Sequence, residues 1–108
     1  MQEHLGRCAE QLRHAVRHLA NSSGSPQNKL IGMYDNTGFG SIFQGDFPVD
    51  SLRNDFLTIR ASLIKTSEPQ VAGNIAAMHD EQAHKVIVQI CGLSDAVAYA
   101  LGRQSKST

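Results

Sequence analysis

The chain has 108 residues, with ten basic and ten acidic side chains, two cysteines and no tryptophan. This length suits a single domain, 1–108, with a core of modest size. Because the charges cancel, the composition gives no reason to expect nucleic acid or a membrane surface as the partner. No uninterrupted apolar run reaches the roughly 18 residues of a bilayer-spanning helix.

The two cysteines and the first residues of the chain indicate the cellular compartment. Cys8 and Cys91 lie far apart in the sequence, in segments with helical patterning, so a disulfide framework is not expected. The first residues carry no signal-peptide pattern. These features predict a cytoplasmic protein.

The first predicted helix spans 3–20. Apolar residues recur there at helical spacing, and the run Asn21–Pro26, rich in serine, ends the pattern. The predicted buried face consists of Leu5, Cys8, Ala9, Leu12, Ala15, Val16 and Leu19. Arginine and histidine side chains occupy the opposite face.

A β-hairpin is predicted over 29–44. Two short runs with β-branched and aromatic residues, 30–34 and 39–43, flank a turn-forming Asp-Asn-Thr-Gly sequence. The glycines within the runs weaken them as strands. Because a lone hairpin is marginal in water, this one is expected to pack on helices or to pair with a second copy.

A second helix is predicted over 48–66, with Pro48 in its first turn. Its apolar residues follow the three- and four-residue spacing of a coiled-coil seam. They are Val49, Leu52, Phe56, Ile59 and Leu63.

A long or kinked helix is predicted over 68–102, followed by a frayed polar tail over 103–108. Ser67 and Gln70 have the spacing of a capping box, and the middle of the segment is apolar on nearly every side. Two alternatives stay open: the β-branched run within 85–91 also fits a strand, and Gly92 could end one helix before another begins.

These elements predict a mainly α fold, a small bundle of three main helices with the hairpin between the first two. The apolar middle of the last helix needs more cover than two shorter helices give, so a homodimer is predicted. The predicted interface residues are Val86, Val88, Ile90, Cys91 and Val97. The favoured hypothesis is therefore a non-catalytic protein, without cofactor or metal, that acts by binding itself or another protein.

The alternative hypothesis is a binder of a small anionic or nucleotide-like molecule, in a pocket between the hairpin and the helices. A helical wheel places His79 on the apolar face of the last helix, where a neutral imidazole needs polar partners. An arginine suits an anionic group. The predicted pocket residues are Tyr34, Phe39, Phe43, Arg53 and His79.

A third hypothesis is a metal- or RNA-processing enzyme. Glu81 and His84 have the Glu-x-x-His spacing of di-iron bundles, but it occurs once where such sites need it twice. His14 and His18 could share a zinc ion, but two ligands do not complete a structural site. Arg13 and His18 resemble the Arg-x4-His signature of HEPN-type ribonucleases in spacing alone. We therefore assign no catalytic residue.

Overall fold

Helices make up the fold in the computed structural model, which describes residues 2–37, 39, 42, 47, 49–63 and 71–106. No strand occurs in this part of the chain. The helices are α1 (Gln2–Asn21), α2 (Pro26–Asn36), α3 (Asp50–Leu63), α4 (Val71–Ala76) and α5 (Asp80–Lys106). The mainly α prediction is therefore confirmed.

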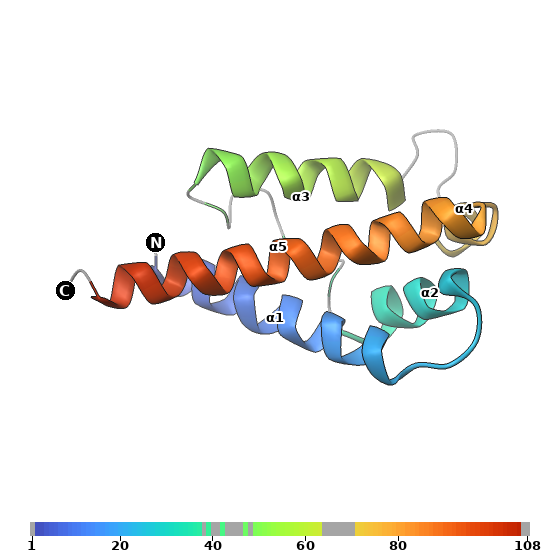
Figure 1. Cartoon of the computed structure of the whole chain (residues 1–108), viewed down its shortest axis with the longest axis horizontal. Coiled ribbons are helices and arrows are strands. Elements are labelled where there is room, and N and C mark those ends of the chain that lie inside the picture. The colour runs from blue at the N-terminus through green and yellow to red at the C-terminus, as the bar shows by residue number, and fades with distance from the viewer. Residues whose placement is uncertain are drawn as a thin grey trace.

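Helix α5 is the axis of the molecule. It runs the whole length of the fold, with α3 along one side, α1 and α2 along the other, and α4 beside its first turns (Figure 1). At 1.5 Å per residue its 27 residues extend about 40 Å, which accounts for most of the 45 Å long dimension. The helix is continuous through 85–91 and Gly92, so neither the strand nor a break at that glycine is observed.

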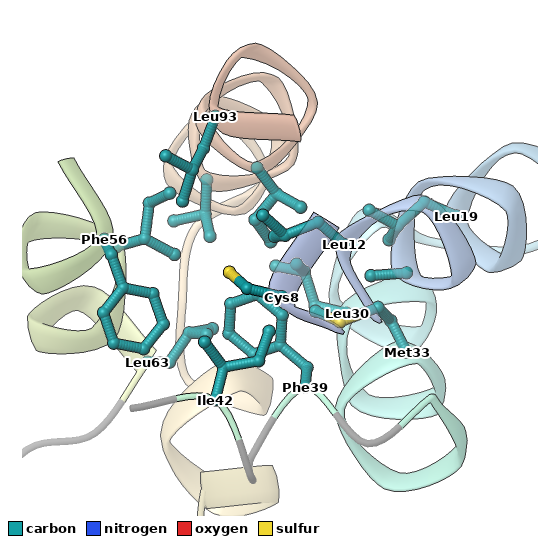
Figure 2. Close-up of a cluster of buried hydrophobic side chains, with 14 of the residues drawn as sticks. Cys8, Leu12, Leu19, Leu30, Met33, Phe39, Ile42, Phe56, Leu63 and Leu93 are labelled. Carbon is teal, nitrogen blue, oxygen red and sulfur yellow. The ribbon is translucent and has the colours of Figure 1, made fainter. Parts of the chain in front are cut away.

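The core lies between α5 and the other helices. Cys8 and Leu12 of α1, Phe56 of α3 and Leu93 of α5 point toward one another, and all four are buried (Figure 2). Aromatic rings extend this cluster in a chain from Tyr34 through Phe39 to Phe56 and Phe47. Phe39, Ile42 and Phe47 thus fix the connection between α2 and α3 to the core.

The predicted hairpin over 29–44 is wrong, because its first arm lies within α2. Ser25 caps this helix, since its hydroxyl accepts a hydrogen bond from the backbone N–H of Asn28 at 3.2 Å, and Pro26 occupies the first turn. The helix ends at Thr37, whose hydroxyl and backbone N–H both donate to the carbonyl of Met33. Leu30 and Met33 face the core. Of the second arm, the structure describes Phe39 and Ile42, and the backbone N–H of Ile42 donates to the carbonyl of Phe39 at 3.1 Å.

The helix predicted over 68–102 is divided at 77–79 into α4 and α5. The side-chain amide of Gln27, from α2, donates to the carbonyl of Met78 and to the carboxylate of Asp80, both at 2.8 Å. In an uninterrupted helix the Met78 carbonyl would accept from the backbone four residues later. The start of α2 therefore holds the junction of α4 and α5. Beyond 102, α5 continues to Lys106, where a frayed tail was expected.

We expect Gln27→Ala to lower the free energy of unfolding by about 1 kcal/mol, because two hydrogen bonds across the α4–α5 junction are lost. Urea denaturation followed by circular dichroism would measure the change. Asn28→Ala, at the next and exposed position, is the control and should stay within about 0.5 kcal/mol of the parent chain. Equal stabilities for the two variants would show that Gln27 does not hold the junction.

Asn74 is the buried polar side chain that joins α4 to α3. It is 3 % exposed, and its side-chain amide donates to the carbonyl of Leu63 at 3.0 Å. That carbonyl belongs to the last residue of α3, where no intrahelical donor is available. Asn74 thus serves as a tertiary cap for α3.

Candidate functional site

The side of α5 that faces away from the core carries the most unusual surface among the described residues. Seven of its exposed positions form a line with alternating spacings of four and three residues, which is the repeat of one helical face, and Asp80, Gln82, His84 and Ala98 are exposed beside this line. We call this line the outward stripe; it consists of Glu81, Lys85, Val88, Gly92, Asp95, Tyr99 and Gly102. Val88 is 56 % and Tyr99 is 69 % exposed, although both are large and apolar in character.

From Val88 to Gly102 the only charged residue on α5 is Asp95. The outward faces of the neighbouring helices are different. On α1 the exposed positions include Arg13 and Arg17, and on α3 they include Asp55 and Arg60. Charged faces of this kind are ordinary solvated surfaces. The weakly charged half of α5 is therefore the candidate functional surface.

Two grooves flank the outward stripe. One, of about 550 Å³, lies between α1 and α5 and is lined by Ala9, Val16 and Leu101 among others. The other, of about 610 Å³, lies between the start of α3 and α5 and is lined by Leu52 and Tyr99 among others. Asp95 borders both grooves, so the second half of α5 forms a ridge between them. A ridge with a groove on each side is a shape that another helix can pack against.

Gly92, near the middle of the stripe, has no explanation within the chain. A glycine inside a helix costs about 1 kcal/mol relative to alanine. A Cβ atom added at Gly92 would meet no atom within 4 Å, so no crowding requires the glycine. Gly32 of α2 is different, since a Cβ there would lie 2.8 Å from Nε2 of His18. The space above Gly92 is available to a partner.

Cys91 lies beside the stripe and is half-buried. Burial raises the pKa of its thiol above the ordinary value, and the negative charge of Asp95 raises it further. The thiol is therefore protonated at neutral pH and is a poor nucleophile. Cys8 is buried in the core and forms no disulfide.

The five predicted interface residues fall on different sides of α5. Val86, Ile90 and Val97 are buried in the core of their own chain, Cys91 is half-buried, and Val88 is exposed. The sequence prediction missed Lys85, Gly92, Asp95 and Tyr99 on the outward side. Their regular spacing was present in the sequence, but the apolar residues on the inward side gave a stronger signal. The homodimer itself stays a prediction.

The predicted ligand residues do not converge. Phe39 is buried and Tyr34 half-buried, and their rings pack together with centroids 6.3 Å apart as part of the core. The guanidinium of Arg53 donates to the Asp50 carboxylate at 2.8 Å and to the Phe47 carbonyl at 3.1 Å. Phe43 lies outside the described residues.

His79 is far from this cluster. It is exposed in the turn before α5, whereas the wheel placed it on a buried face. The start of α3 packs beside Asp95–Ala100, which the rise of α5 separates from His79 by about 20 Å or more. A single pocket that contains both Arg53 and His79 is therefore not formed.

The described residues are not arranged in a way that supports the metal or the ribonuclease hypothesis. Within the described ranges, no three His, Cys, Asp or Glu side chains are grouped closely enough to hold a metal ion. Glu81 and His84 are both exposed on α5. Arg13 borders the groove between α1 and α5, while the ring of His18 lies against Gly32 of α2. The two residues of the HEPN-like spacing thus face different neighbours.

The segment Asp80–Gly102 of α5 is long and apolar enough, by length and composition alone, to cross a bilayer. Core helices of soluble proteins that are mostly buried pass the same test; here 22 % of the 18-residue window is buried, and α5 packs against α1, α2 and α3. Comparison of the chain with family models, with curated proteins and with solved structures finds no match.

Proposed function

We propose that this protein is a non-catalytic interaction protein that self-associates through the outward stripe of α5. The observation that carries the proposal is a helical face on which Val88 and Tyr99 are largely exposed, with a single charge between Val88 and Gly102. Burial of apolar surface contributes roughly 25 cal/mol per Å². A second copy can provide that cover because it presents the same surface, as in a two-fold symmetric interface.

A bilayer is a less suitable cover for this stripe than a second copy. Asp95 lies within the apolar half of α5, and an aspartate in the middle of a membrane-spanning helix costs about 2.5–3.5 kcal/mol. The inward side of α5 supplies Val86, Ile90 and Val97 to the core, which insertion would dismantle. Another protein surface can instead pair the Asp95 carboxylate with a cation or leave it at a wet rim.

Val88→Glu is expected to raise the dimer dissociation constant about a hundredfold, because it adds a carboxylate to the range Val88–Gly102, where Asp95 is the only charged residue. Sedimentation equilibrium at micromolar concentration would measure it. Asn54→Glu, which adds the same charge at an exposed position of α3, is the matched control and should leave the dissociation constant unchanged. Circular dichroism should show the same helix content for both variants, since both positions are solvent-exposed.

A monomeric parent chain at these concentrations would overturn the proposal, as would a dimer that Val88→Glu leaves intact. Flotation with neutral phospholipid vesicles provides the other arm of the test. A parent chain that stays monomeric and floats with vesicles would assign the stripe to a lipid surface instead.

A further inference from the structure

We infer that two copies pair antiparallel through α5, with Lys85 of each chain opposite Asp95 of the other and Val88 opposite Gly92. This inference rests on the proposed self-association and adds its orientation and register. It is drawn from the order of residues along the outward stripe, all of which are exposed.

The spacing of the stripe is symmetric under reversal. Its successive steps from Glu81 to Tyr99 are four, three, four, three and four residues, so the sequence of steps is the same in both directions. Two such helices, turned head to tail about the point midway between Val88 and Gly92, place each stripe residue from Glu81 to Tyr99 opposite another stripe residue. Alternating steps of three and four are the repeat of helices packed at about 20°.

The charges select this orientation. In the antiparallel register, the ammonium group of Lys85 faces the Asp95 carboxylate of the second copy, and symmetry forms this pair twice. A parallel arrangement would place lysine against lysine and aspartate against aspartate. Within one chain the two groups lie ten residues apart on α5, about 15 Å along the axis, which is too far for them to pair with each other.

The glycine fits the same register. Opposite Val88, the second copy presents Gly92, so the side chain of one helix meets a position without a Cβ atom in the other. The space above Gly92 is open in the single chain, and the absence of a Cβ atom permits two helices to approach closely there. The register therefore gives a reason for a glycine that the isolated fold does not require.

Charge reversal tests the orientation. Lys85→Glu and Asp95→Lys should each raise the dissociation constant about tenfold, because both symmetry-related pairs change from attraction to repulsion. The double variant, with both changes in one chain, should return to within about threefold of the parent because the pairs are restored with opposite sign. Sedimentation equilibrium in low salt would measure all four proteins, since salt screens exposed pairs. Single reversals that leave the constant unchanged would overturn the antiparallel register.

Glycine substitution tests the register along the axis. Gly92→Leu should weaken the dimer about tenfold or more, because the new side chain meets Val88 of the second copy. Gly102→Leu is the matched control: it lies on the same stripe but opposite position 78, before α5 of the second copy begins, and should change the constant less than threefold. Equal effects at the two glycines would overturn the register. A dimer that Val88→Glu disrupts but charge reversal does not would keep the proposed function and remove this inference alone.

Discussion

Phe56→Ala is expected to lower the free energy of unfolding by about 3–5 kcal/mol, the largest loss we predict for a single substitution here. Phe56 is 1 % exposed, and its ring lies 4.9 Å from that of Phe47 and 6.2 Å from that of Phe39, between centroids. Truncation removes the contacts that attach the α2–α3 connection to α3 and leaves a cavity between these rings.

Urea denaturation at a fixed protein concentration would measure this loss, because self-association makes stability depend on concentration. Asn54→Ala, on the exposed side of the same helix, is the control and should change the free energy of unfolding by less than about 0.5 kcal/mol. If Phe56→Ala does not fold, Phe56→Leu should fold with a smaller loss that can still be measured. A loss below about 1 kcal/mol for the alanine variant would show that the aromatic cluster is not part of a tightly packed core.

Asn74→Asp should destabilise the fold by about 3 kcal/mol at pH 7, more than Asn74→Ala. Asn74 is buried and donates to the Leu63 carbonyl. Alanine leaves that carbonyl without its donor, which costs about 1–3 kcal/mol. An ionised carboxylate loses the same hydrogen bond, faces the carbonyl oxygen with like polarity and must also be desolvated.

The loss of stability caused by Asn74→Asp should increase as pH rises. Burial favours the protonated form of the introduced carboxyl, so its pKa in the folded state is raised above the unfolded value of about 3.9. When the folded pKa of a group is raised, the free energy of unfolding falls as pH rises from the unfolded pKa toward the folded one. The variant should therefore be closest in stability to the parent near pH 4 and less stable than the parent by a growing margin toward pH 7. Thermal unfolding of both proteins across this range would measure it. Asn54→Asp, at an exposed site, should show no comparable trend, and a pH-independent loss at position 74 would contradict the buried contact.

The helices with a strong amphipathic pattern could be predicted from sequence. Leu12 and Leu19 of α1, and Phe56 and Leu63 of α3, recur at helical spacing and are buried as expected. The predicted ranges 3–20 and 48–66 overlap α1 and α3 closely. This works because a helix buries one face whatever it packs against, so the period of the apolar residues is enough.

Helix α2 could not be predicted from periodicity in this way, since only Leu30 and Met33 of its 11 residues are buried. Short apolar runs fit strands and helices equally well. Ser25 and Pro26 form a helix start, but they stand in a run of turn-forming residues that equally fits the end of the preceding helix. A helix this short is stabilised mainly by its tertiary contacts rather than by its own propensity.

The amino-acid sequence of this protein was enough to determine that helices would form. It also determined that the first helix and α3 would each have one apolar face, and that the last segment would carry apolar residues on several sides. Tertiary structure alone decided that this segment would be divided at 77–79, where Gln27 of α2 hydrogen-bonds to Met78, and which side of α5 would face the core. The reason is that both outcomes depend on groups far apart in sequence. Once Val86, Ile90 and Val97 were buried, the remaining side of α5, with Lys85, Val88, Gly92, Asp95 and Tyr99, was left facing the solvent.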